Sequence, residues 1–166
     1  MQGNFAPALE YFRKALAINE ALGDEAGIGR THLGLGLVHW LQGDFTQASE
    51  HYRKSLTIFE ASDNKTAIAT VLNNIGNIHR YQGDYARALE YYGKSLKIRE
   101  GLNDTFGILG SLGNIGVVYS AQGNYAKALD YYRRSLAMSE AHRRRGPRPR
   151  RCRCWACGRC GRRAQR

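Results

Sequence analysis

The sequence predicts an all-α protein, an α-solenoid built from antiparallel helix pairs, and three observations support this. A phrase of twenty residues recurs four times at a spacing of forty, beginning at residues 1, 41, 81 and 121. Apolar and small residues within each unit follow the spacing of a helical face and never the strict alternation of a strand. A Gly followed by Asp or Asn separates two such segments in every unit.

Each forty-residue unit contains two amphipathic segments, as residues 64–101 show. The first segment has its apolar stripe at Ile68, Val71, Leu72, Ile75, Ile78 and Tyr81, and the second at Tyr85, Ala88, Leu89, Tyr92, Leu96 and Ile98. These intervals match the 3.6-residue period of an α-helix. We therefore expect helices over residues 5–22, 25–42, 45–61, 65–82, 85–101, 105–122 and 125–141.

Short turns separate the expected helices, and their residues suit both a helix end and a helix start. Glycine can adopt the left-handed conformation that follows a helix, and Asp or Asn can cap the next one by accepting its free backbone N–H groups. Within units the pair is Gly3-Asn4, Gly43-Asp44, Gly83-Asp84 or Gly123-Asn124, and between units Asp24, Asn64 and Asp104 recur. We expect each of these Asp and Asn residues to be an N-cap.

Small residues recur on both helices of a unit, in the pairs Gly36 and Ala48, Gly76 and Ala88, and Gly116 and Ala128. Glycine costs a helix about 1 kcal/mol relative to alanine, so its return at one register predicts a close contact between the two helices. A phosphate-binding loop at Gly34–Gly36 is disfavoured, because no strand is expected before it and no Lys-Ser/Thr follows it.

The excess charge is confined to one end of the chain. Residues 1–140 contain 14 Lys or Arg and 14 Asp or Glu, so the net charge of +11 comes from the eleven arginines between Arg143 and Arg166. We therefore divide the chain into an array at residues 1–141 and a disordered basic tail at residues 142–166. The array consists of a lone second helix at 4–22 and helix pairs at 24–61, 64–101 and 104–141.

The tail has three competing interpretations. It holds all the cysteines, at Cys152, Cys154, Cys157 and Cys160, which could bind zinc, although structural zinc sites usually separate two Cys-x2-Cys pairs by a longer loop. Its arginines could bind nucleic-acid phosphates, which would confine nucleic-acid binding to the tail. The favoured interpretation is out-of-frame translation, because an Arg-, Gly-, Pro- and Cys-rich stretch stands where a new first helix is due.

The repeat pattern resembles the tetratricopeptide repeat (TPR) at Leu72, Ile75-Gly76, His79, Gly83-Asp84-Tyr85, Ala88, Tyr92 and Ser95. The family's unit has about 34 residues, and the six additional residues of this one fall between Ile98 and Thr105. In this respect the chain resembles the longer-helix branch found in spindle-orientation adaptors of the Pins type and in kinesin light chains. The resemblance covers residues 1–141 and implies helix pairs stacked into a superhelix with a concave groove.

The resemblance also implies that the first helix of each unit lines the groove, where extended peptides or partner helices bind. The corresponding residues here are Arg30, Leu33, Leu37, Trp40, Thr70, Asn73, Asn74, Asn77, Arg80, Gly113, Asn114, Val117 and Ser120. Asn74 and Asn114 share a register from which an amide can bind peptide main chain, whereas Gly34 interrupts that register in the first complete unit. Arg30 and Arg80 could receive a carboxylate. The competing interpretation is that the asparagines are solvated residues without a function.

No catalytic chemistry is expected. The sequence contains no Ser-His-Asp set, no paired carboxylates beside a base and no nucleotide motif, so we expect a non-enzyme without a cofactor. His39 and His79 share a register in which the family often has an aromatic residue, and this favours ring packing over metal binding.

The sequence therefore predicts a protein–protein interaction scaffold that binds a protein or peptide, with no small-molecule substrate and no membrane. The alternative is a sensory or regulatory segment of a larger signalling protein, such as a kinase, cyclase or transcription regulator. No secretory signal precedes the repeat, which favours the cytoplasm, and no apolar run approaches the ~20 residues of a membrane span. Because repeat arrays normally need a polar capping element at each end and this chain has neither, we expect a fragment of a longer array that is marginally stable or self-associates through its ends when expressed alone.

Overall fold

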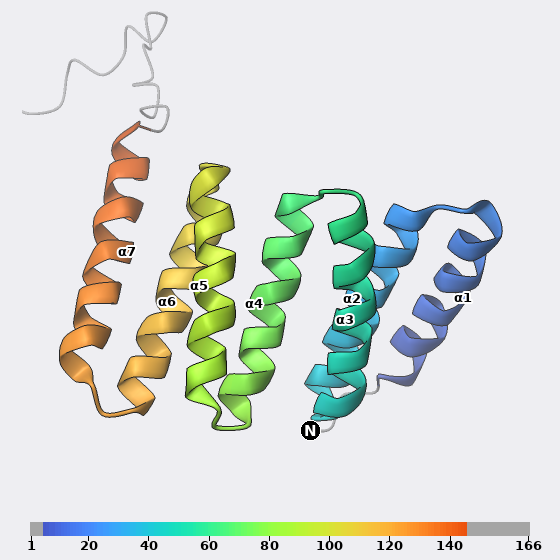
Figure 1. The fold of residues 1–166 in the computed structure, drawn as a ribbon, viewed down its shortest axis with the longest axis horizontal. Coiled ribbons are helices and arrows are strands. Elements are labelled where there is room, and N and C mark those ends of the chain that lie inside the picture. The colour runs from blue at the N-terminus through green and yellow to red at the C-terminus, as the bar shows by residue number, and fades with distance from the viewer. Residues whose placement is uncertain (1–4, 146–166) are drawn as a thin grey trace, which may run out of the picture.

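The computed structural model describes residues 5–145, and every regular element in this part of the chain is a helix. The elements are α1 (Ala6–Leu22), α2 (Glu25–Leu41), α3 (Phe45–Ala61), α4 (Lys65–Tyr81), α5 (Tyr85–Gly101), α6 (Thr105–Ala121) and α7 (Tyr125–Arg145). Consecutive helices run antiparallel and pack side by side (Figure 1). The all-α solenoid predicted from the sequence is confirmed.

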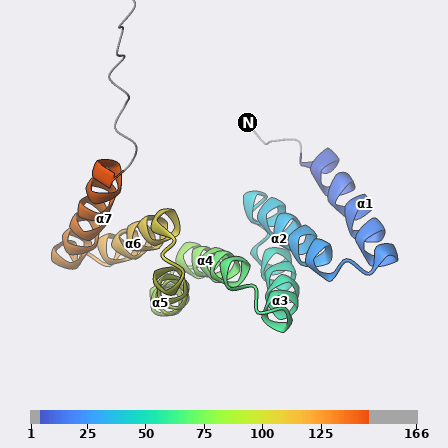
Figure 2. The ribbon, with the colours of Figure 1, turned by 90° about the horizontal axis from the view of Figure 1, so that it is seen from above.

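The helices form an arc, which is clearest when the molecule is seen from above (Figure 2). α2, α4 and α6, the first helices of the three complete pairs, lie on the inner side of the arc, and α3 and α5 lie on the outer side. We call the exposed surface of α2, α4 and α6 on this inner side the inner face. It corresponds to the groove that the sequence resemblance implied.

The helix boundaries match those expected from the sequence to within one residue, with one exception. α7 continues to Arg145, so residues 142–145, which the sequence analysis assigned to the tail, are its last turn. An ion pair one turn apart, Arg144 to Glu140 at 3.9 Å, lies on this extension. The rest of the tail, from residue 146, lies outside the described residues, and with it the predictions of disorder and of altered reading frame.

The segment that lengthens the repeat is only partly helical. Residues 99–101 complete α5, and residues 102–104 form the turn to α6. The six residues therefore do not simply add two turns to one helix.

Side-chain caps begin six of the seven helices described, as predicted. Between pairs, Asp24, Asn64 and Asp104 each accept a hydrogen bond from the backbone N–H three residues on, at 2.8 to 3.1 Å. Within pairs, Asp44, Asp84 and Asn124 do the same at 3.0 to 3.2 Å. α1 differs, because it begins at Ala6 with Phe5 in the N-cap position and no side-chain cap; Asn4, the cap expected here, lies outside the described residues.

A left-handed residue lies between each helix from α1 to α6 and the cap of the next helix, beginning with Gly23 at a φ angle of 65°. Gly43, Gly83 and Gly123 have φ angles of 80°, 79° and 75°, as their place in the repeat predicted. Between pairs, the same conformation is adopted by Asp63 and Asn103, at φ angles of 48° and 53°. Asp and Asn tolerate this region better than other non-glycine residues, so the turn keeps its shape without glycine.

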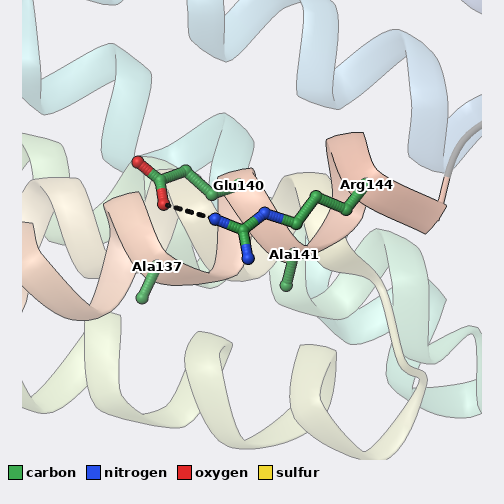
Figure 3. Close-up of a pocket in the computed structure, with 4 residues that line it drawn as sticks. All are labelled: Ala137, Glu140, Ala141 and Arg144. Atoms are coloured by element: carbon green, nitrogen blue, oxygen red, sulfur yellow. Dashed lines mark ion pairs between the residues drawn. The ribbon is translucent and has the colours of Figure 1, made fainter.

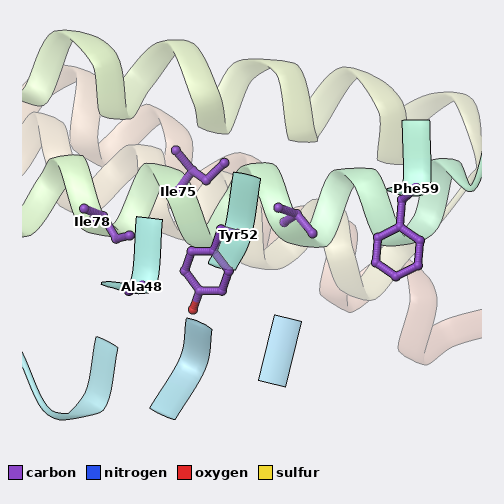
Figure 4. Close-up of a cluster of buried hydrophobic side chains, with 6 residues drawn as sticks. Ala48, Tyr52, Phe59, Ile75 and Ile78 are labelled. Atoms are coloured by element: carbon purple, nitrogen blue, oxygen red, sulfur yellow. The ribbon is translucent and has the colours of Figure 1, made fainter. Parts of the chain in front are cut away.

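The core lies between successive helix pairs. Ala48, Tyr52 and Phe59 of α3 pack against Val71, Ile75 and Ile78 of α4, and all six are buried (Figure 4). Ala88 and Tyr92 of α5 repeat this contact with Ile115 and Val118 of α6. Burial of apolar side chains therefore links each pair to the next, and no pair completes its hydrophobic core alone.

The glycines of the first helices make close contacts, but their nearest neighbours are not the alanines that the sequence suggested. A Cβ atom added to Gly36, Gly76 or Gly116 would lie 2.5 to 2.7 Å from the ring of Tyr52, Tyr92 or Tyr132, respectively. The glycines make room for aromatic rings within each pair. Ala48 and Ala88 belong to the clusters shared with the following pair.

Candidate functional site

The residues predicted to line the groove all lie on α2, α4 and α6, and each is at least partly exposed. A repeat of forty residues places equivalent positions of the three helices at matching heights along the inner face. Some of these side chains form an amide cluster and others an aromatic cluster. A third set forms hydrogen bonds between the two helices of a pair, and Arg30, Leu37 and Val117 belong to none of these groups.

The amide cluster consists of Asn73, Asn74 and Asn114. The Asn114 Nδ2 atom donates a hydrogen bond to the Asn73 Oδ1 atom at 2.9 Å, which joins α6 to α4. The Asn74 side chain has no hydrogen-bond partner among the described residues. Asn74 and Asn114 share a register, but only the Asn74 side chain keeps both its amide donor and its amide acceptor without a partner within residues 5–145, because the Asn114 amide donates to Asn73.

Two of the predicted groove residues, Asn77 and Thr70, serve the α4–α5 contact. The buried Tyr92 hydroxyl donates to the Asn77 Oδ1 atom at 2.7 Å. The Thr70 hydroxyl donates to the Thr66 carbonyl at 3.0 Å and accepts from the Arg99 Nη2 atom at 3.3 Å. The Asn77 Oδ1 atom and the Thr70 hydroxyl, which were predicted to contact a ligand, are therefore already hydrogen-bonded within the α4–α5 pair.

The aromatic cluster joins the C-terminal ends of α2 and α4. The Trp40 ring meets the Tyr81 ring edge to face, with centroids 5.4 Å apart. The Arg80 guanidinium lies over the same Tyr81 ring, 4.4 Å from its centroid, a distance at which a cation and an aromatic face attract. Trp40 Nε1 and Arg80 Nε are both buried without a hydrogen-bond partner.

Arg30 lies apart from this cluster, near the start of α2. Its guanidinium forms an exposed ion pair with Asp24 at 3.4 Å. Since Arg30 is in the second turn of α2 and Arg80 in the last turn of α4, about ten residues at 1.5 Å separate their heights on the inner face, or roughly 15 Å. The two arginines cannot grip one carboxylate together.

Apolar side chains flank the amides. Leu37 and Val117 are 45% and 39% exposed and occupy the register that Asn77 has in α4. Side chains of this kind can receive the apolar residues of a ligand, while the amides meet its main chain.

His39 and His79 pack against rings, as predicted from their register. His39 stacks on His51 with centroids 5.4 Å apart, and His79 stacks on Tyr91 at 5.3 Å. Tyr119 and Tyr131 repeat this stack in the third pair at 5.5 Å. His51 was not among the predicted residues, although it shares its register with the ring-bearing residues Tyr91 and Tyr131.

Other surfaces of the described chain offer less. An open depression on α7 is lined by Ala137, Glu140, Ala141 and Arg144, and combines two methyl groups with one solvent-exposed ion pair (Figure 3). No cluster of three His, Cys, Asp or Glu residues suited to a metal occurs between residues 5 and 145. The four cysteines proposed as a weak zinc site lie outside that range. None of the helices described combines the length and hydropathy required to cross a membrane.

Comparison with known proteins agrees with this geometry. The sequence model described as Tetratricopeptide repeat matches residues 1–61 and 67–141. The chain belongs to the tetratricopeptide repeat family. No curated protein sequence gives a significant match.

Solved structures of TPR proteins share the fold. BtubC (BKLC) from P. vanneervenii is 27% identical, with a TM-score of 0.76 over 90% of this chain, which spans 62% of the length of BtubC. The TPR domain of Arabidopsis FLU is 21% identical, with a TM-score of 0.63 over 68% of this chain and 95% of that domain. The N-terminal domain of stress-induced protein-1 (STI-1) from C. elegans is 20% identical, with a TM-score of 0.58 over 69% of this chain and 86% of that one. The last two likenesses concern the fold alone.

Proposed function

We propose that this TPR array is a non-catalytic interaction module that binds an extended peptide, free or within a partner protein, on its inner face. TPR repeats generally mediate protein–protein interaction. Three equivalent helices, α2, α4 and α6, line the inner side of the arc (Figure 2). The observation that carries the proposal is the amide cluster, in which Asn114 is bonded to Asn73 and Asn74 stays unbonded.

The chemistry of the amide cluster suits a peptide main chain. An extended peptide rises about 3.3 Å per residue, and each residue presents one backbone N–H and one C=O group. Each amide side chain offers both a donor and an acceptor for such groups. Asn74 can form such bonds at no cost to the fold, because it breaks none within the array.

The charges of the inner helices favour an acidic ligand. α2, α4 and α6 contain one acidic residue, Glu25, against Arg30, Lys65 and Arg80. A peptide with an acidic side chain or a free carboxylate would meet opposite charge at Arg80, or at Arg30 in competition with the ion pair that Arg30 forms with Asp24. Leu37 on α2 and Val117 on α6 add apolar contact on the two helices that flank α4.

A selection of displayed random peptides on the full chain tests the proposal. Peptides selected by the wild-type chain should lose at least tenfold in affinity when Asn74→Ala and Asn114→Ala are combined, since two hydrogen bonds of about 1 kcal/mol each are removed. Gln47→Ala combined with Lys97→Ala, on α3 and α5, is the matched control and should leave the affinity unchanged. Selected peptides that bind the asparagine variant as tightly as the wild type would contradict the proposal.

A further inference from the structure

Three histidines meet between α2 and α3, apart from the residues proposed to bind peptide. The Nδ1 atoms of His32 and His51 are 3.0 Å apart. The His39 ring is stacked on the His51 ring, with 7° between the ring planes. His32 is 8% exposed, and His39 Nδ1 is buried without a hydrogen-bond partner.

The other helix pairs show that packing does not require these histidines. The residues at the registers of His32, His39 and His51 are Leu72, His79 and Tyr91 in the second pair, and Leu112, Tyr119 and Tyr131 in the third. The third pair forms the same ring stack with two tyrosines. Only the first of the three pairs combines imidazoles at all three positions, so a property that Leu and Tyr lack distinguishes it.

Imidazole gains a proton near neutral pH, which the side chains of Leu and Tyr do not. No set of three ligands in residues 5–145 is arranged to hold a metal. In the neutral state, Nδ1–H of one imidazole can donate to the bare Nδ1 atom of the other across 3.0 Å. When both are protonated, two N–H groups and two positive charges oppose each other at that distance, which disfavours the contact.

The surroundings of His32 and His51 favour their neutral forms. Burial lowers the pKa of His51 to about 4, and positive charge on His32, His39 and Lys54 acts in the same direction. Burial, followed by Lys54, also lowers the pKa of His32, against a smaller opposing effect of Glu20 on α1. α4 meets α3 through apolar side chains of the shared core.

We propose that His32, His39 and His51 form a proton-sensitive contact that holds α2 against α3 at neutral pH and loosens this helix pair in mild acid. A histidine whose folded-state pKa is lowered takes up a proton when the contact opens. Its stabilisation is complete above the unfolded pKa of about 6.5 and declines as the pH falls from there toward the folded value near 4. Because α2 carries Leu37 and Trp40, opening the pair would also withdraw its share of the inner face, a consequence that rests on the proposed function.

The repeat itself supplies the variant that tests this proposal. His32→Leu, His39→Tyr and His51→Tyr together copy the α6–α7 pair and remove the imidazoles while retaining groups that pack in the same register. Trp155→Phe is introduced in the reference protein and in every variant. It leaves Trp40 on α2 as the single tryptophan of the full chain, so its fluorescence reports on α2. His79→Tyr in the second pair is the matched control.

Urea unfolding followed by Trp40 fluorescence at pH 7.5 and pH 5 gives the result. In the reference protein, the folding equilibrium constant reported by Trp40 should fall about 10- to 30-fold for each of His32 and His51 that takes up a proton when the contact opens. The His79→Tyr control should show the same fall, and the triple variant should show one at least tenfold smaller. An equal fall in the triple variant and the reference protein would overturn the proposal.

A second measurement is independent of how the triple variant folds. Proton NMR titration of the imidazole Cε1–H signals in the wild-type chain should show His51 titrating near pH 4 and the pKa of His32 lowered from its ordinary value of about 6.5. Midpoints at or above pH 6.5 for both residues would overturn the proposal.

Discussion

The middle and last helix pairs contain the same tyrosine in different surroundings. Tyr92 of α5 and Tyr132 of α7 each cover a glycine of their own pair, Gly76 and Gly116. Tyr92 is 0% exposed and Tyr132 is 39% exposed. The difference arises because α6 packs against α5, whereas within the described residues no helix follows α7. A helix pair positions its tyrosine, and the next pair buries it.

Replacement of Tyr92 or Tyr132 by alanine should reveal their different burial as the largest difference in the free energy of unfolding. Tyr92→Ala removes a fully buried ring and leaves the Asn77 acceptor without its partner, so the free energy of unfolding should fall by about 3–5 kcal/mol. Tyr132→Ala should cost about 1–2 kcal/mol, because much of its ring already meets water. Urea unfolding followed by circular dichroism gives both values, and equal losses would mean that pair-to-pair burial does not govern stability.

Alanine at two glycines should separate close packing from helix propensity, with a smaller effect. Gly76→Ala places a methyl 2.7 Å from the Tyr92 ring and should destabilise the array by about 1–3 kcal/mol. Gly110→Ala, in a helix where a Cβ meets nothing within 4 Å, should stabilise it by about 0.5–1 kcal/mol. Midpoints of thermal unfolding that move in the same direction for both variants would contradict this contrast.

The helix caps should show the smallest effect and no difference between the two regions. Asn64 caps α4 in the middle of the array, and Asn124 caps α7 at its end. Because a cap acts on its own first turn, replacement of either by alanine should cost about 1 kcal/mol in the free energy of unfolding. A loss at Asn64 several times that at Asn124 would show that the caps also depend on neighbouring pairs.

Local sequence signals predicted the elements well, because the groups involved are close in the chain. Gly43 and Asp44 end one helix and begin the next through their own backbone and side chain, so their residue types suffice. The forty-residue recurrence then multiplied this local signal and gave the order of the helices.

Contacts between helices were harder to predict, because they depend on how two axes cross. The sequence paired Gly76 with another small residue, Ala88, and could not show that the Tyr92 ring covers the glycine. It placed Asn74 and Asn114 in one register, whereas the twist from α4 to α6 brings Asn114 to Asn73. His32 and His51 are nineteen residues apart on two helices, and only a comparison of all three pairs sets them apart from ordinary core positions.

Chemical-shift mapping of backbone amides in the full chain, on addition of a selected peptide, tests most directly whether the inner face is the binding surface. We expect the largest shifts in α4 and α6 around Asn74 and Asn114, with smaller ones near Leu37 and Trp40 of α2. Shifts concentrated on the exposed residues of α3 and α5, with those around Asn74 and Asn114 unchanged, would contradict this expectation.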